Sequence, residues 1–363
     1  MNPIHFHLLG PGAIGLLASS FLSTTRAALP PPTILFRSQA ALDRFVADAS
    51  SSFPLPTITV QTNGSPRFHS RGQHPSPASY RCNRFRTASA SNLEPNYTIS
   101  HLIVTTKANQ TLEAIKPYVR FLTPSSVIVL LQNGVLSSYA SVRSVIPSTR
   151  IIFGSTTVGA YRTSPSSIFL SGPTGQTFLG PLLDSPSDTE VDRTLVALQD
   201  LSASLSDGPL AGASPNLNIE IKSASEINRI VILKLIANSI INPITSLGQF
   251  QNGVLSNDSP NASRLVELAS HECARLFADR LGMSETALSA YLVDHVFDIT
   301  TRTAANRSSM LEDTLAGRDT EIDCLNGYLV EVAQQRRISV PVLEFLFHMV
   351  KLKSNSTRLD RDS

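Results

Sequence analysis

The sequence predicts an α/β fold in the first half of the chain and an all-helical fold in the second half. In the first half, short runs rich in β-branched residues alternate with helical runs, which is typical of a parallel sheet wrapped by helices. From about residue 224 the apolar residues follow a helical period nearly to the end, and only polar turns such as 256–261 interrupt them. We therefore expect two domains of different architecture.

The elements of the first domain are expected where a β-rich or helical run lies between turn residues. The expected strands are 4–9, 33–36, 57–61, 102–106, 127–131 and 150–155, and the expected helices are 13–23, 39–48 and 108–119. A stretch rich in Gly, Pro and Ser at 206–216 indicates the domain boundary. We assign 1–217 to the first domain, 218–355 to the second and 356–363 to a polar tail, although a strand at 218–222 also fits the first sheet.

The length and composition fit two ordinary globular domains. The chain has 363 residues, of which 42% are hydrophobic and 16% charged, so each domain can bury its own core. No apolar run reaches the roughly 20 residues needed to span a bilayer. Only nine residues precede Gly10, which is too short for a signal or transit peptide. We expect a soluble, cytoplasmic protein with no membrane partner.

Cysteine spacing and charge argue against several kinds of site. Cys82, Cys273 and Cys324 lie far apart without CxxC spacing, so neither a disulfide framework nor a metal site is expected. The net charge of +2 gives no general case for a nucleic-acid partner.

Residues 64–92 are rich in Ser, Pro and Arg and contain no acidic residue, which predicts a basic surface insertion. RNA or an acidic partner is the alternative there, but a solvated loop is favoured and we assign it no function.

A glycine motif lies near the start of the sequence. Gly10, Gly12 and Gly15 follow an apolar run and precede a helical one, which matches G-x-G-x-x-G in the strand-turn-helix context that the motif requires. Gly10 permits the tight turn, Gly12 lets a pyrophosphate approach the backbone, and Gly15 allows the helix to pack on the strand. Ala13 and Ile14 complete the turn, where the N–H groups of the helix start face the phosphates. The motif favours a Rossmann-type dinucleotide-binding domain over a mere tight turn.

The end of the second expected strand indicates which dinucleotide is bound. NAD-binding domains usually carry an acidic residue there, about 20 residues past the glycines, which holds the ribose hydroxyls. This chain has Arg37 instead, 22 residues after Gly15. A guanidinium can grip a 2′-phosphate with its fork of donors, which favours NADPH (NADP) as the cofactor. The alternative is a surface arginine on the next loop, since Asp43 lies too far into the next helix to replace the acid.

Two further strand ends carry polar residues. Lys107 follows the strand expected at 102–106, and Gln132 and Asn133 follow the strand expected at 127–131. Ligands of open parallel sheets collect at the carboxyl ends of the strands. A lysine there can hold a carboxylate or phosphate, and an asparagine can bind both a ribose and a substrate. Each alone is more often an ordinary loop residue, but an edge shared with the glycine turn favours a binding role.

The second domain begins with an apolar helix that contains three polar residues. Lys234, Asn238 and Asn242 recur every four residues, so successive side chains lie about 40° apart on one stripe of the helix. Burying an amide without a partner costs about 1 to 3 kcal/mol, and burying an unpaired ammonium costs more. The stripe is therefore predicted to face a polar cavity. The alternative is that Lys234 reaches solvent and the amides bond neighbouring backbone.

Several stretches together resemble the ketopantoate reductase (2-dehydropantoate 2-reductase) family. They are GPGAIG (10–15), TTKANQT (105–111), LLQNGV (130–135), KLIANSIINPITSL (234–247), NRSSMLEDTLAGRDTEIDCLNGYLV (306–330) and ISVPV (338–342). They occur in family order across nearly the whole chain, and SSMLED followed by TEID and NG is highly specific. The chain departs from the family at Ile232, where a tryptophan is frequent, and in the length of the basic stretch.

The resemblance implies an N-terminal Rossmann domain, a helical C-terminal domain, and NADPH bound between them. It also implies that Lys234 is the catalytic lysine and that Glu321 assists substrate binding and catalysis. The other roles that it implies are Lys107 and Asn133 beside the nicotinamide and substrate, Arg37 at the 2′-phosphate, and Asn133, Asn238, Asn242 and Ser309 at the substrate.

The implied reaction is the NADPH-dependent reduction of ketopantoate, a 2-oxo acid, to pantoate, a step of pantothenate and coenzyme A biosynthesis. A free lysine has a pKa of about 10.4, so burial must bring it closer to working pH for it to donate a proton well. The alternatives are a reductase of another branched 2-oxo acid and a non-catalytic NADP-binding scaffold. Retention of Lys234 and Glu321 argues against the scaffold. The oligomeric state stays open, with a homodimer as one option.

Overall fold

The computed structural model describes residues 4–24, 29–53, 55–62, 78–171, 175–182, 188–207, 216–256 and 258–362. The chain forms two compact units, Met1–Asn228 and Arg229–Ser363. The division lies eleven residues after the boundary expected at 217, because strand β12 (Ile219–Ile221) pairs with the first sheet, as the alternative assignment of 218–222 allowed. The boundary stretch 206–216 lies mostly outside the described residues.

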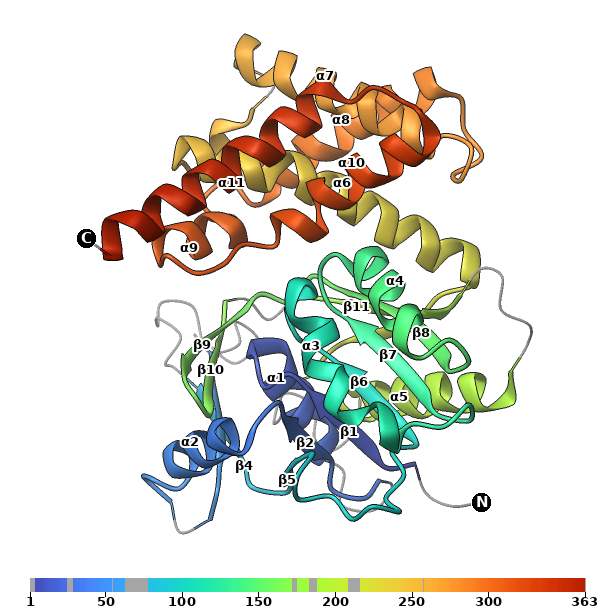
Figure 1. Cartoon of the computed structure of the whole chain (residues 1–363), viewed down its shortest axis with the longest axis vertical. Coiled ribbons are helices and arrows are strands. Elements are labelled where there is room, and N and C mark those ends of the chain that lie inside the picture. The colour runs from blue at the N-terminus through green and yellow to red at the C-terminus, as the bar shows by residue number, and fades with distance from the viewer. Residues whose placement is uncertain are drawn as a thin grey trace. The chain divides into compact units, whose positions relative to one another are not determined.

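Within the described residues, unit 1 contains an eight-stranded sheet (Figure 1). Its spatial order is β12, β11 (Thr177–Pro181), β8 (Arg150–Thr156), β7 (Val127–Leu131), β6 (His101–Val104), β1 (Phe6–Leu9), β2 (Thr33–Phe36) and β5 (Arg86–Ser89). The strands from β8 to β5 are parallel, and β11 runs antiparallel to β8. The order β5-β2-β1-β6-β7-β8 is that of the doubly wound dinucleotide-binding fold, whose switch point lies between β1 and β6.

The central strands are continuous apolar runs because helices cover both faces of the sheet. Every residue of β7 is buried. On one face, α1 (Ala13–Ser23) and α5 (Thr189–Asp207) share an apolar core with alternate strand residues such as Ile103 and Val129. On the other face, α4 (Val135–Val145) packs against β7 and α3 (Thr111–Ile115) (Figure 1). The α/β architecture expected of the first domain is confirmed.

Most of the expected elements are present, with shifts at their ends. The strands expected at 33–36 and 127–131 and the helix at 13–23 match the structure, and the helix at 39–48 is α2 (Gln39–Ala49). The helix expected at 108–119 is wrong as a single element. It consists of a 3-10 turn (Ala108–Gln110), α3 and a second 3-10 turn (Lys116–Phe121), because Pro117 has no N–H for a regular helical hydrogen bond.

A second sheet lies against α1 and changes the interpretation of the basic stretch. Within the described residues its order is β4 (Ala78–Cys82), β3 (Ile58–Thr62), β10 (Ser167–Leu170) and β9 (Ala160–Ser164). The strand expected at 57–61 therefore belongs to this sheet and not to the parallel one. The surface insertion expected at 64–92 is wrong in part, because β4 and β5 fall inside it and Ala88 and Ser89 are buried. Their short alternating pattern was hidden by a composition rich in Ser and Arg. Residues 63–77 lie outside the described part.

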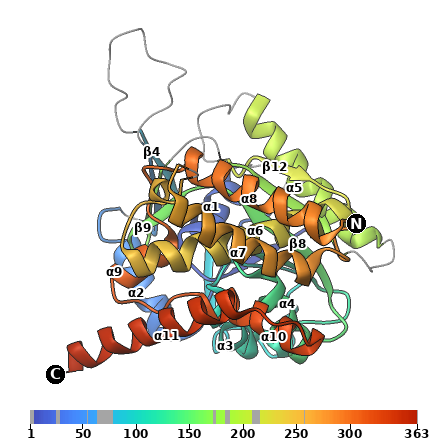
Figure 2. The same ribbon diagram turned by 90° about the horizontal axis from the view of Figure 1, so that it is seen from above.

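Unit 2 is helical, as expected. Its helices are α6 (Ala224–Gly248, which starts in unit 1), α7 (Pro260–Phe277), α8 (Glu285–Arg302), α9 (Ser309–Leu315), α10 (Asn326–Arg336) and α11 (Pro341–Asp362) (Figures 1 and 2). The starts of α7, α8 and α9 are capped by the hydroxyls of Ser259, Ser284 and Ser308. The backbone of α11 continues through Asp362, so the residues expected as a tail from 356 extend this helix.

Helix α6 is the most apolar helix of unit 2. Among the described helices it is the one that is long and apolar enough to cross a membrane by length and composition. Most of its apolar window, 78%, is buried inside the structure, and core helices pass the same test. Pro243 lies inside the helix, which nevertheless runs to Gly248.

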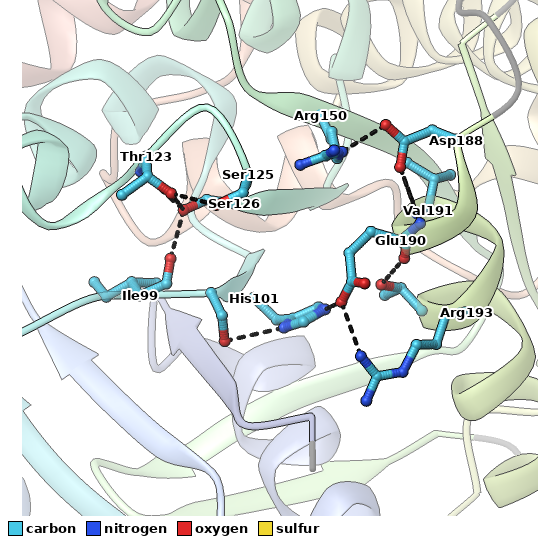
Figure 3. A network of polar contacts seen from close by, with 12 residues as sticks. Ile99, His101, Thr123, Ser125, Ser126, Arg150, Asp188, Glu190, Val191 and Arg193 are labelled. Atoms are coloured by element: carbon cyan, nitrogen blue, oxygen red, sulfur yellow. Dashed lines mark hydrogen bonds and ion pairs between the residues drawn. The ribbon is translucent and has the colours of Figure 1, made fainter. Parts of the chain in front are cut away.

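Histidines gather at the amino ends of β1 and β6, on the edge opposite the glycine turn. His7 Nδ1 donates to the His101 carbonyl oxygen at 3.3 Å, so His7 Nε2 accepts from the Tyr97 hydroxyl at 2.7 Å. The His101 ring lies 3.4 Å from the Glu190 carboxylate, which Arg193 also contacts (Figure 3). Burial lowers the pKa of His7 to about 3 and that of His101 to about 4. Both imidazoles are therefore neutral in the folded protein near pH 7.

We expect this cluster to make the protein sensitive to acid. As the pH falls below about 6.5, His7 and His101 bind protons in the unfolded chain but stay neutral in the folded protein. The free energy of unfolding should then fall by up to roughly 1.4 kcal/mol per pH unit for each histidine. His7→Asn keeps a donor but does not titrate, so urea unfolding between pH 7 and 5 should show a shallower loss. The exposed His271→Asn is the control, and an equal pH slope in both variants would contradict the assignment.

Candidate active site

The turn after β1 brings three glycines to the carboxyl edge of the main sheet. Gly10 has a φ of +103°, a conformation that favours glycine. A Cβ on Gly15 would lie 2.0 Å from the Gly10 carbonyl oxygen. Gly12 differs, because its Cβ would meet nothing closer than the Thr105 carbonyl oxygen at 3.9 Å. The fold itself requires Gly10 and Gly15, whereas the space beside Gly12 can receive a ligand.

The start of α1 and the end of β2 offer positive charge at the same edge. Helix α1 opens with Ala13 and Ile14, and within the described residues it has no side-chain cap and no acidic residue in its first turn. Its first N–H groups can therefore bind an anion. Arg37 directly follows β2 and is exposed, and β2 pairs in parallel with β1. These groups can bind the phosphates of a nicotinamide dinucleotide.

Gln132 ties the loop after β7 to the loop after β6. Its Nε2 donates to the Thr106 carbonyl oxygen at 2.7 Å and to Thr111 Oγ1 at 2.8 Å. Thr105 Oγ1 then donates to the Gly10 carbonyl oxygen at 2.7 Å, which joins these loops to the glycine turn. Gln132 Oε1 is buried and has no hydrogen-bond partner among the described residues. That oxygen is an acceptor that a bound molecule or water can satisfy.

The same loops carry the expected Lys107 and Asn133. Lys107 directly follows Thr106, Asn133 directly follows Gln132, and both side chains are partly buried. The hydrogen bonds of Gln132 therefore fix the backbone on which both residues lie. The sequence indicated Gln132 only as a neighbour of Asn133, and its role depends on a pairing between two loops that the motif alone does not reveal.

In unit 2, Lys234 lies on α6 and interacts with Glu321. The helix buries Ile232, Leu235 and Ile236 around Lys234, as the apolar pattern predicted, and the lysine side chain is itself largely buried. Burial lowers the pKa of Lys234 to about 8, and the Glu321 carboxylate opposes this shift. An amine with this pKa is largely protonated at pH 7 and yet gives up its proton more readily than a lysine in water.

The other polar residues of the stripe extend along α6. Asn238 is partly exposed and Asn242 is 7% exposed, and no hydrogen bond of either side-chain amide is found within the described residues. Ser309 is the first residue of α9 and is exposed. The neighbouring Ser308 hydroxyl lies 2.7 Å from Thr245 Oγ1, one helical turn after Asn242. This hydroxyl pair joins α6 to the start of α9, the two helices that carry Asn242 and Ser309.

Known proteins resemble the chain over most of its length. Residues 6–184 match the family model "Ketopantoate reductase PanE/ApbA", and residues 226–354 match "Ketopantoate reductase PanE/ApbA C terminal". The 2-dehydropantoate 2-reductase of Vibrio cholerae is 26% identical over 350 residues, which are 96% of this chain and 97% of that protein. The 2-dehydropantoate 2-reductase of Salmonella typhi is 31% identical over 255 residues, 70% of this chain and 74% of that protein.

A solved structure supports the fold. The ternary structure of D-mandelate dehydrogenase with NADH and anilino(oxo)acetate has a TM-score of 0.74 to this chain at 18% sequence identity. The match covers 98% of this chain and 99% of that one. A Rossmann-type first unit followed by a helical second unit is therefore a known fold.

Two glycine substitutions should separate binding from folding. Gly12→Ala places its Cβ in ordinary contact with the Thr105 carbonyl oxygen at 3.9 Å, so we expect normal thermal stability but NADPH affinity weakened at least about tenfold. Gly15→Ala collides with the Gly10 carbonyl and should lose about 1 to 3 kcal/mol of stability. Thermal unfolding and titration of cofactor fluorescence measure the two effects. Unchanged NADPH affinity in a folded Gly12→Ala variant would contradict the prediction that the glycine turn binds the diphosphate.

Proposed function

The chain belongs to the ketopantoate reductase family, and we propose that it reduces ketopantoate to pantoate with NADPH. Members of this family are oxidoreductases, and a nicotinamide dinucleotide is the cofactor that the first unit fits. The observation that carries the proposal is the Lys234–Glu321 pair, since a desolvated amine whose lowered pKa is partly restored by a carboxylate suits proton donation. A scaffold has no need of this pair.

The residues of unit 1 hold the cofactor in this proposal. The N–H groups at the start of α1, including Ala13 and Ile14, bind the diphosphate, which approaches beside Gly12. Arg37 binds the 2′-phosphate. Lys107 and Asn133 lie on the loops that Gln132 locks together, and they contact the nicotinamide ribose and the substrate. When bound, the cofactor supplies the hydride that the carbonyl carbon of the 2-oxo acid accepts.

The residues of unit 2 bind the substrate and supply the proton. Asn238, Asn242 and Ser309 hold the carboxylate and hydroxyl of the 2-oxo acid. As negative charge develops on the carbonyl oxygen, the Lys234 ammonium stabilises it and donates a proton to it, which leaves a 2-hydroxy acid. Glu321 keeps the lysine protonated by its charge. Each turnover therefore leaves a neutral amine that must take a proton from water.

Two further assignments belong to the same proposal. Another branched 2-oxo acid is the alternative substrate, and a panel of such acids with purified protein distinguishes it from ketopantoate. We also propose that the enzyme is soluble and cytoplasmic, with α6 as a core helix. A homodimer stays a prediction, which size-exclusion chromatography tests.

The decisive assay is NADPH oxidation by the purified protein with ketopantoate. We expect turnover in the wild type and a loss of about 10²- to 10⁴-fold in kcat for Lys234→Ala, because the proton donor and its charge are removed. NADPH affinity should be unchanged, because unit 1 holds the cofactor. The exposed Lys116→Ala serves as the matched control. Near-normal turnover of the Lys234→Ala variant would contradict the assignment of Lys234 as the proton donor.

Arg37 should determine the choice of cofactor. Arg37→Ala removes the cation proposed for the 2′-phosphate, so the KM for NADPH should rise by about tenfold or more while the KM for NADH changes little. Steady-state kinetics with both cofactors measure the two constants. Arg44→Ala, an exposed arginine on α2, is the control. Equal effects on NADPH and NADH would remove this role from Arg37.

A further inference from the structure

Pro243 leaves a backbone carbonyl of α6 without its helical donor. In an α-helix each N–H donates to the carbonyl four residues earlier, and proline has no N–H. The carbonyl that loses its donor is that of Ser239, a residue with 0% exposure. Water does not reach such a position, and an unsatisfied buried carbonyl costs about 1 to 3 kcal/mol. A donor from elsewhere in the chain is therefore needed.

Asn326 supplies that donor. Its Nδ2 donates to the Ser239 carbonyl oxygen at 3.0 Å, and Asn326 is itself 0% exposed. The orientation of the amide is fixed, because the opposite one would place two oxygens against each other. Asn326 is the first residue of α10, so this bond joins the start of α10 to the middle of α6.

The same bond joins the two segments that carry the residues of the proposed proton-donating pair. Lys234 is five residues before Ser239 on one continuous helix. Glu321 is five residues before Asn326, and the segment between them is a tight turn. The Glu321 carbonyl oxygen accepts from Cys324 N at 3.0 Å and from Leu325 N at 3.1 Å. Both connections are short and hydrogen-bonded, so movement at Asn326 is transmitted to Glu321.

We propose, on the basis of the proposed function, that Asn326 is a positioning residue that holds Glu321 at its working distance from Lys234 through the Ser239 carbonyl freed by Pro243. Pro243 then contributes to the positioning of Glu321, because it leaves the Ser239 carbonyl oxygen free to accept the hydrogen bond from Asn326. A purely structural role would require only that the Ser239 carbonyl have some donor.

A double variant separates these two roles. Pro243→Ala restores an N–H for the Ser239 carbonyl, and Asn326→Leu replaces the amide with two methyl groups on a side chain that branches at the same carbon. Asn326→Leu alone leaves the carbonyl unsatisfied and should lower the melting temperature. The double variant should regain most of that loss, yet it has no tether between α6 and the Glu321 turn. If the double variant with leucine does not fold, the double variant Pro243→Ala/Asn326→Ala is used in its place.

The decisive measurement is an NMR titration of the Lys234 side chain in the wild type and in the double variant. With Glu321 loosened, the charge that keeps Lys234 protonated weakens, so the pKa of Lys234 should fall below its wild-type value. The kcat should fall about ten- to hundredfold, because the pair is misplaced, while the KM for NADPH stays unchanged. Ser246→Ala is the matched control, since it removes a 2.7 Å hydroxyl contact between α6 and Thr314 of α9.

The outcomes distinguish this inference from the proposed function. A stable double variant with the wild-type Lys234 pKa would overturn the positioning role and leave Asn326 as a structural donor. An equal pKa decrease in Ser246→Ala would overturn it as well, because any cross-link of α6 would then suffice. If the wild type does not reduce ketopantoate, the proposed function fails, and the pKa comparison still decides whether Asn326 positions Glu321.

Discussion

The candidate site depends on one amine that α6 buries beside a carboxylate. Removing an ammonium from water is costly, and the apolar residues around Lys234 impose that cost. Glu321 offsets part of it, which leaves the amine protonated at neutral pH but more acidic than in solution. A folded chain that needed only stability would do better with an apolar residue at this position. The charge at this position therefore supports the proposed role of Lys234 in proton donation.

In unit 1, the proposed cofactor site depends on the close packing of the turn after β1. A Cβ on Gly15 would collide with the Gly10 carbonyl oxygen, and the Thr105 hydroxyl donates to the same oxygen, so the turn after β1 is tightly packed. Gln132 extends this fixed network to the ends of β6 and β7. The residues proposed to hold the cofactor thus lie on backbone that these hydrogen bonds fix, and a fixed binding site lowers the entropic cost of binding.

The sequence predicted the parts of the fold that depend on local pattern. Strands 33–36 and 127–131 were found to the residue because apolar runs buried on both faces have sharp limits. The edge strands β4 and β5 were missed, since an edge needs little apolar sequence and theirs lies in a basic stretch. The glycine turn and the lysine stripe were readable as motifs. The bond between Ser239 and Asn326 was not, because it joins residues 87 apart in sequence.

The most direct test of the account is the pH dependence of hydride transfer in a single turnover. In the proposed mechanism the reduction requires protonated Lys234, whose pKa is lowered to about 8, so the rate should fall as the pH rises through about 8. Glu321→Gln removes the negative charge that raises the pKa of Lys234 against the effect of burial. In this variant the pKa of Lys234 should therefore fall further, and the rate should be lost at lower pH. A rate that stays constant up to about pH 10, the range of an ordinary lysine, in both proteins would contradict the account.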